Sequence, residues 1–425
     1  MAPTKDELER GTAAQDEENL ETSFPEGGLR AWAAVAGSFL VQFCGFGRAF
    51  WVRAIQTFLT LYSRYTNAFG VYQDFYVRHY LTTSTSSAIS SVLNPPPRWI
   101  GSVSAFLIFA GGLLSGRLYD RGYFYPLIWG GSFLCTLSLF MLSLCKPDQY
   151  YQIFLAQALG VGLGAGIMYV PSIAVISHYF QRRRTLAMCI PTSGSCLGAV
   201  VHAIMLNNTL HDDHLGFGSA VRMSAGLVGG LLLIACLLMH PRLPPPQTHL
   251  PLRKSISRFV RDVPCMLTVG AYYFPLFYLQ LEAVKHGIDE HVAFYTLVIL
   301  NASGFFGRLL PGFLPNRLGV IDIATLSSAV VAVFILCLLA LSKTMVGVLV
   351  FSVLCGFFGG MFFTTMPPII AVLTPNIEGL GLRIGIGFAI VGLGGLVGPP
   401  IEGALLTSRF IWWRPTLFSG VRSVT

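Results

Sequence analysis

The segment GLLSGRLYDRG occupies residues 112–122, at the end of a long apolar run that begins near residue 99. A related pattern recurs 196 residues later, where Gly312 is followed by Asn316 and Arg317. The same shift aligns further glycines and prolines: Gly160 with Gly356, Gly164 with Gly360, Pro171 with Pro367 and Gly198 with Gly394. We interpret the shift as an internal duplication. Chance matches in a chain with 45 glycines are the alternative.

The composition indicates a chain surrounded by lipid. Of its 425 residues, 53% are hydrophobic and only 11% are charged, and the mean hydropathy is +0.63. A water-soluble surface needs roughly a quarter of its residues charged, so an ordinary soluble protein is excluded. The net charge of +8 comes from short basic clusters between apolar runs, which favours membrane orientation over nucleic-acid binding. The nine cysteines lack metal-ligand spacing, and we expect no metal.

We expect an all-α integral membrane protein with about eleven complete transmembrane helices and a truncated twelfth, because a span needs about 20 apolar residues. A first span near 31–77 is followed by candidates near 99–118, 125–145, 151–177, 185–206, 217–240, 263–282, 292–314, 320–342, 345–371 and 384–406. Lys and Arg gather in the loops of one side, and the positive-inside rule assigns that side and the N-terminus to the cytoplasm. Residues 1–30 are expected to form a disordered cytoplasmic tail.

A proline-rich, basic segment at 241–262 divides the apolar part of the chain. Because proline excludes a continuous helix, we expect an extended cytoplasmic linker there. The linker would separate an N-terminal helix bundle, 31–240, from a C-terminal bundle, 263–425, that is incomplete at its end. With the duplication, this organisation predicts two pseudo-symmetric bundles around a central cavity.

The segment 112–122 resembles the signature loop of the major facilitator superfamily. In that family a glycine permits close helix packing, and an Asp-Arg pair holds neighbouring helix ends together. The resemblance implies the major facilitator fold and a transporter that works by alternating access. It implies gating roles for Gly116, Asp120, Arg121, Asn316 and Arg317. A charge cluster that only sets membrane orientation is the alternative interpretation.

Two further motifs resemble those of the monocarboxylate porter family, and we expect the relatives of this chain to be fungal members of that family. Glu26-Gly27-Gly28, with Trp32 four residues on, is similar to its acidic-Gly-Gly-x-x-x-Trp motif before the first span. HYFQRRRTLA at 178–187 is similar to its Tyr-Phe-x-basic-basic-x-x-Leu-Ala motif at the fifth span. The resemblance implies a small, anionic substrate.

Arg308 is the leading candidate for substrate contact. It lies in an apolar run, where an arginine costs about 3 kcal/mol on insertion scales and usually faces a cavity or a counter-charge. In the resembled family the arginine at this place binds the substrate carboxylate, which suits a planar guanidinium. Snorkelling to the membrane surface is the alternative. The candidate substrate-binding set is completed by Asn67, Tyr72 and Asn301.

The chain also departs from the resembled family. Animal members carry an Asp where this chain has Gly304, and a first-span lysine where it has Asn67. Both changes argue against proton-coupled transport of a simple monocarboxylate. Segments 48–64 and 91–98 interrupt the family-like sequence, and we interpret them as insertions, with a genuine outer loop and re-entrant helix as the alternative. After Trp412 and Trp413, the few remaining residues are too short for a twelfth span.

The sequence therefore predicts a secondary active transporter for a small organic acid or fungal metabolite, placed in the plasma membrane. We expect the lipid bilayer and an anionic small molecule as partners, with proton coupling left open, and neither nucleic acid nor cofactor. A non-transporting sensor or an inactive truncated remnant is the alternative. A membrane-embedded enzyme is less favoured, because the spans hold no convergent catalytic set, and we expect no enzymatic activity.

Overall fold

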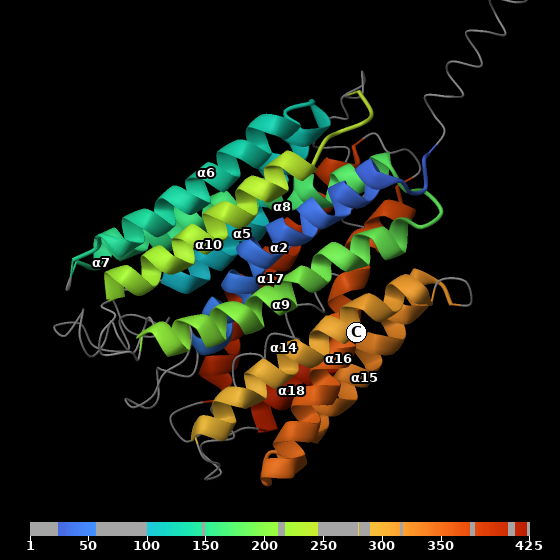
Figure 1. Cartoon of the computed structure of the whole chain (residues 1–425). Coiled ribbons are helices and arrows are strands. Elements are labelled where there is room, and N and C mark those ends of the chain that lie inside the picture. Colours follow the sequence, from blue (N-terminus) through green and yellow to red (C-terminus); the bar gives the residue numbers. More distant parts are fainter. Residues whose placement is uncertain are drawn as a thin grey trace, which may run out of the picture.

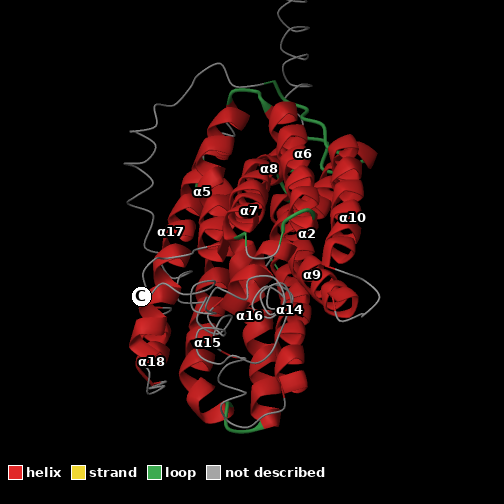
Figure 2. Cartoon of the chain, turned by 90° about the vertical axis from the view of Figure 1, so that its left-hand side faces the viewer, coloured by secondary structure: helices red, strands yellow, loops and turns green. Residues whose placement is uncertain are grey.

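The computed structural model describes residues 24–56, 100–146, 149–210, 217–244, 279, 290–314, 318–374, 379–406 and 413–422. Within these ranges the chain is helical and contains no strand (Figure 1), which confirms the expected all-α membrane fold. Seen from the side, the long helices run along roughly one direction (Figure 2).

The helices before the expected linker include one rod made of several consecutive pieces. Those pieces are α7 (Tyr150–Ile153), the π-helical η2 (Phe154–Val161), α8 (Gly162–Ala174) and the 3-10 turn η3 (Val175–His178). The other helices of this part are α2 (Leu29–Gln56), α5 (Ile100–Asp120), α6 (Phe124–Ser143), α9 (Arg184–Leu210) and α10 (Phe217–Leu238). After it come α14 (Glu290–Phe313), α15 (Val320–Leu341), α16 (Met345–Val372), α17 (Leu380–Leu406) and α18 (Trp413–Arg422).

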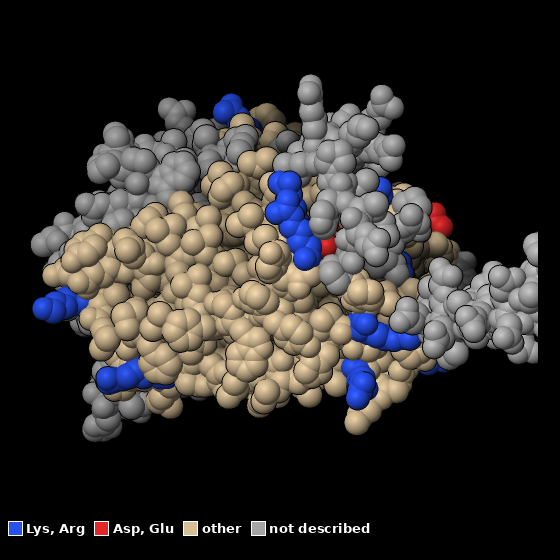
Figure 3. Space-filling view, turned by 90° about the horizontal axis from the view of Figure 1, so that it is seen from above, with Lys and Arg blue, Asp and Glu red and all other residues tan. Residues whose placement is uncertain are grey.

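Seven helices in the described ranges are long and apolar enough to cross a bilayer. In lipid each backbone polar group must be satisfied within its own segment, so an apolar run of this length forms a helix. One face of the molecule presents a broad area without charged side chains, with Lys and Arg mainly toward its margins (Figure 3). Such a surface fits contact with acyl chains. The expected total of about eleven spans stays a prediction, since 57–99 and 263–278 lie outside the described residues.

The internal duplication is visible in where the helices begin. At the shift of 196 residues, the first residue of α6 falls on that of α15, the first of α9 on that of α17, and the first of α10 on that of α18. The packing follows the same relation, because α5 packs against α17 while its counterpart α14 packs against α9. The two equivalent interfaces, α5·α17 and α9·α14, join helices that precede the linker to helices that follow it.

Close approach at both interfaces depends on equivalent glycines. A Cβ added to Gly116 of α5 would lie 2.1 Å from the carbonyl oxygen of Gly381 in α17. A Cβ added to Gly312 of α14 would lie 2.6 Å from Cδ1 of Leu186 in α9. Small residues let backbones meet in membranes, where packing and not water exclusion drives helix association. The matched glycines found in the sequence therefore mark helix contacts.

Two features bear on the expected interruptions of the chain. Helix α2 continues without a break through residues 48–56, the first part of the supposed insertion, while 57–64 and 91–98 lie outside the described residues. Helix α18 packs against α15 and α17 after the eleventh expected span. The status of both segments as insertions, the linker at 245–262 and the two bundle boundaries stay proposals.

Candidate functional site

Arg308 lies where three helices meet. It belongs to α14, and only 7% of its surface is exposed. Its Nη1 donates a hydrogen bond to the backbone carbonyl of Thr192 in α9, at 2.7 Å, and a second to Oγ of Ser195. Its guanidinium carbon is 5.8 Å from the ring centre of Phe363 in α16, within the range of a cation–π contact. The side chain is thus buried between helices, which excludes the snorkelling alternative.

A hydroxyl pair lies beside this arginine. Oγ1 of Thr192 shares a hydrogen bond with Oγ1 of Thr364 in α16. Helix α14 packs closely against both neighbours at Gly304, where an added Cβ would lie 3.2 Å from the carbonyl oxygen of Gly356 in α16 and 3.3 Å from Sγ of Cys196 in α9. We call Thr192, Ser195, Arg308, Phe363 and Thr364 the Arg308 cluster. It is a polar contact at the α9·α14 interface.

Asn301 lies two turns before Arg308 on the same helix. It is 3% exposed, and its Nδ2 donates to the carbonyl of Leu297 at 3.0 Å. No described group donates to its Oδ1, so this buried acceptor stays available to a ligand. The other two predicted substrate contacts, Asn67 and Tyr72, lie outside the described residues.

Asp120 occupies the contact between α5 and α17. Its Oδ1 accepts from the backbone N–H of Gly381 at 3.0 Å, and its Oδ2 accepts from that of Leu382 at 2.8 Å. These N–H groups belong to the first turn of α17, where a helix attracts negative charge. We call this arrangement the gate contact. Arg121 is exposed beside it, and Asn316 and Arg317 lie outside the described residues.

The gate contact perturbs the acidity of its carboxyl group. Burial raises the pKa of Asp120 from 3.8 to about 6, although the two N–H donors act in the opposite direction. A carboxyl group with this pKa changes charge in the mildly acidic range. We therefore expect the contact between α5 and α17 to depend on pH in this range.

Glu26 joins the two motifs that resemble the porter family. Its Oε1 accepts from the backbone N–H of Gln181 at 2.8 Å and of Arg182, and its Oε2 accepts from that of Arg183 at 3.1 Å. Its own N–H donates to the carbonyl of Tyr179 at 3.1 Å, and its φ of +51° is rare for a residue with a side chain. Nearby, Trp32 packs edge-on against Phe180 at 5.4 Å between ring centres.

The Glu26→Gln variant is expected to be less stable at neutral pH, because an amide offers one acceptor and no charge to three N–H groups. Burial raises the pKa of Glu26, but those donors and Arg182 outweigh it and leave the pKa below its ordinary value of 4.5. A lowered pKa stabilises the folded state above about pH 4.5, and the gain is lost as the pH falls through the folded value. Thermal unfolding should show a deficit of roughly 2 °C at pH 7. A deficit unchanged at pH 4 would contradict this account.

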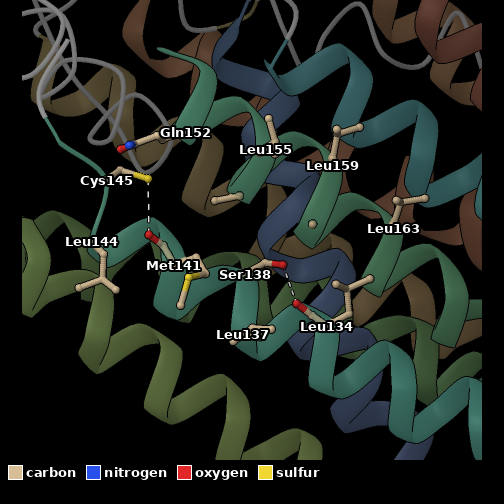
Figure 4. Close-up of a pocket in the computed structure, with 12 residues that line it drawn as sticks. Leu134, Leu137, Ser138, Met141, Leu144, Cys145, Gln152, Leu155, Leu159 and Leu163 are labelled. Atoms are coloured by element: carbon tan, nitrogen blue, oxygen red, sulfur yellow. Dashed lines mark hydrogen bonds between the residues drawn. The ribbon is translucent and has the colours of Figure 1, made fainter. Parts of the chain in front are cut away.

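A cavity of about 560 Å³ lies elsewhere, between α6 and η2. Leucines make up half of its lining, with Ser138, Cys145 and Gln152 among the other residues (Figure 4). None of the predicted substrate contacts lines this cavity. Its apolar wall can accept a hydrocarbon chain but offers little to orient an acidic substrate, so we place the candidate site at Arg308.

A comparison with protein families decides the assignment of the chain. Residues 54–348 match the family described as the Major Facilitator Superfamily. The chain belongs to this superfamily. As a major facilitator it is a membrane transporter and not an enzyme, which confirms that part of the expectation from sequence.

Relatives of this facilitator are fungal. The chain is 37% identical over 400 residues to the aspyridones efflux protein apdF of Emericella nidulans, covering 93% of this chain and 76% of that protein. It is 36% identical over 395 residues to MFS-type transporter 1 of Ophiocordyceps sp., covering 91% and 80%. The crystal structure of the human organic anion transporter MFSD10 is similar in fold, with a TM-score of 0.66 and 13% identity over 93% of this chain and 99% of that one.

Sequence reasoning about the facilitator missed several contacts. Tyr119 Oη and His178 Nε2 share a hydrogen bond of 2.8 Å, and the N–H of Leu243 donates to His178 Nδ1 at 3.2 Å. This chain of contacts fixes the start of the linker against α5 and η3. The quoted motifs contain Tyr119 and His178, but nothing in the pattern indicates that they meet. Thr192 and Ser195 were also missed, because hydroxyl residues are frequent in membrane helices.

Proposed function

We propose that the chain exports an acidic fungal secondary metabolite, with Arg308 as the contact for the acidic group. The observation that carries the proposal is the guanidinium of Arg308, buried at the interface of three helices. Burial of a charge inside the membrane is energetically unfavourable, so charged residues there usually serve a function. Relatives named as efflux proteins for fungal metabolites favour export over the sensor or remnant alternatives. The resemblance to the porter family supports an anionic substrate.

The proposed transport cycle is alternating access between bundles 31–240 and 263–425. The gate contact lies at the end of the structure where α5 ends and α17 begins, and we assign this end to the cytoplasm of a plasma-membrane protein because arginines gather in its loops. Asp120 of α5 binds the first turn of α17, and on this assignment the described arrangement is closed toward the cytoplasm. Asn301 and, from outside the described ranges, Asn67 and Tyr72 complete the substrate contacts, and proton coupling through Asp120 is consistent with its pKa.

Arg308→Ala tests the proposal. In yeast cells that lack their own exporters and are loaded with aspyridones or an aromatic carboxylic acid, it should raise the KM for export about tenfold or more, the value of one charge-assisted contact. The KM of Arg308→Lys should lie between those of wild type and Arg308→Ala, because lysine keeps the charge but not the planar guanidinium. Neutral methyl esters of the same acids should not distinguish the variants.

The matched control is Arg222→Ala, since Arg222 is exposed on α10 and its guanidinium donates to Ser219 of the same helix. Equal amounts of each variant in the plasma membrane are required for the comparison. An unchanged KM in Arg308→Ala would refute the assigned role of Arg308.

A further inference from the structure

Arg308 is held by α9 in the same arrangement in which the gate contact is closed. Its Nη1 donates both to the Thr192 carbonyl and to Ser195 Oγ, while Asp120 binds the first turn of α17. Opening toward the cytoplasm separates α9 from α14 and breaks the first pair of contacts. The surroundings of the guanidinium therefore differ between the two ends of the transport cycle.

The equivalent interface is built differently. At the shift of 196 residues, Arg308 corresponds to Gly112 and Thr192 to Phe388. There Phe388 of α17 stacks on Phe109 of α5 at 6.0 Å between ring centres. At this matched position the α5·α17 interface is apolar, so the equivalent place in such an interface can close without a polar contact like that of Arg308 and Ser195.

We propose that Ser195 is a positioning residue that competes with the substrate's acidic group for Arg308. The inference rests on the proposed function and deepens it. In the cytoplasm-open state Arg308 is released from α9 and binds the substrate. On closure, Ser195 Oγ and the Thr192 carbonyl return to the guanidinium and replace the acidic group.

This exchange couples substrate release to closure of the cytoplasmic side, while the gradient that drives transport sets its net direction. The Ser195 hydroxyl and the Thr192 carbonyl are neutral acceptors, and they satisfy Nη1 of Arg308 in place of the substrate's acidic group. The substrate therefore loses its contact with Arg308 when the cytoplasmic side closes. The affinity of the closed state for the anion falls, and release occurs on the other side. Coupling of this kind requires a ligand to differ in affinity between two states.

Ser195→Ala tests the exchange, with Ser193→Ala as the matched control. Ser193 lies on the same helix and is equally buried, but its hydroxyl donates to the carbonyl of Ile190 at 2.7 Å within α9. Ser195→Thr keeps the hydroxyl and should restore wild-type behaviour, which separates loss of the acceptor from a change in packing.

The first measurement needs no substrate and uses a native cysteine. Cys196 is buried in α9 facing Gly304, so it becomes accessible when α9 leaves α14. Because its thiol also contacts Ser195, its alkylation in Ser195→Ala is compared with that in Ser195→Thr, which keeps the hydroxyl, and with that of each unfolded variant. Alkylation of Cys196 by N-ethylmaleimide, followed by peptide mass spectrometry, should be about fivefold faster in Ser195→Ala, the effect of one lost hydrogen bond. Ser193→Ala should match wild type, and Cys135, buried between α6 and α8, should report equal integrity in all variants.

The second measurement is the export of aspyridones. Ser195→Ala should lower KM and the maximal rate together, because the substrate keeps Arg308 longer, whereas Arg308→Ala should raise KM. Unchanged alkylation and unchanged KM in Ser195→Ala, with a raised KM in Arg308→Ala, would overturn the exchange and leave the proposed function standing. Faster alkylation with unchanged KM would also overturn it. An unchanged KM in Arg308→Ala would refute the proposed function itself.

Discussion

Gly116→Val is expected to abolish transport, with a fall of more than about 100-fold, because closure between α5 and α17 leaves no room for a side chain. An added Cβ would lie 2.1 Å from the carbonyl oxygen of Gly381 and 2.7 Å from its carbon, both rigid backbone atoms. Overpacking of this kind costs about 3 kcal/mol or more unless the helices separate. We expect the variant to stay open at the Asp120 end, with rapid alkylation of Cys196.

Gly130→Val is the matched control for this prediction. Gly130 lies on α6, and an added Cβ there meets nothing within 4 Å. This variant should transport as wild type does. Transport by Gly116→Val at a comparable rate, at equal protein in the membrane, would show that α5 and α17 need not touch during the cycle.

Asp120→Ala is expected to reduce the export rate about 30-fold. The change leaves the N–H groups of Gly381 and Leu382 without their acceptor in the closed arrangement. Burial of the charge offsets part of these two hydrogen bonds, so we take a net value of about 1 kcal/mol each, which lowers the population of the closed state about 30-fold. In Asp120→Ala, the export rate should fall and the alkylation of Cys196 should become faster.

The gate contact also predicts a pH dependence. The pKa of Asp120 is about 6 in the closed arrangement, and it returns toward 3.8 when the carboxyl group is hydrated in the open one. The closed state therefore binds the extra proton, and acidification from pH 7 to pH 5 favours it. In Asp120→Asn, which cannot titrate at this position, Cys196 alkylation should follow only the pH dependence of the thiolate fraction, without the additional slowing that wild type shows at low pH.

Asp322→Ala serves as the control for Asp120→Ala. The Asp322 carboxylate also accepts a backbone N–H, that of Gly319 at 3.2 Å, but within the start of its own helix α15. Loss of this cap should leave export nearly unchanged. Equal losses in the two variants would mean that Asp120 acts only as a local helix cap.

Much of the fold follows from the pattern of the sequence. Apolar runs of membrane length gave most helix positions, and the shift of 196 residues predicted which helices correspond. The motif at 112–122 predicts a gating role for Asp120, which stays a prediction, and its carboxylate lies at the contact between α5 and α17. Its partners could not be predicted, because backbone N–H groups are the same at every position and leave no trace in a motif.

The site was predictable in part. The burial of Arg308 follows from a charge within an apolar run, but its contacts with Thr192 and Ser195 depend on how closely α9 and α14 pack. The motifs around Glu26 and His178 were found separately, and only the folded chain shows that Glu26 binds the backbone of the second motif. Contacts between segments so far apart require the register of two helices, which one sequence does not contain.

The unequal chemistry of the two matched interfaces has a consequence for how new cargo specificities arise. On one side, the α5·α17 interface has Phe388 stacked on Phe109, and an added Cβ at Gly116, Gly381 or Gly385 would collide with backbone atoms. On the other, the α9·α14 interface also packs on glycines, but at the matched position the Ser195 hydroxyl and the Thr192 carbonyl accept from a single guanidinium. Substitutions of the polar residues of α9 and α14 can therefore change which substrate is bound, while the glycine contacts that close the two interfaces stay the same.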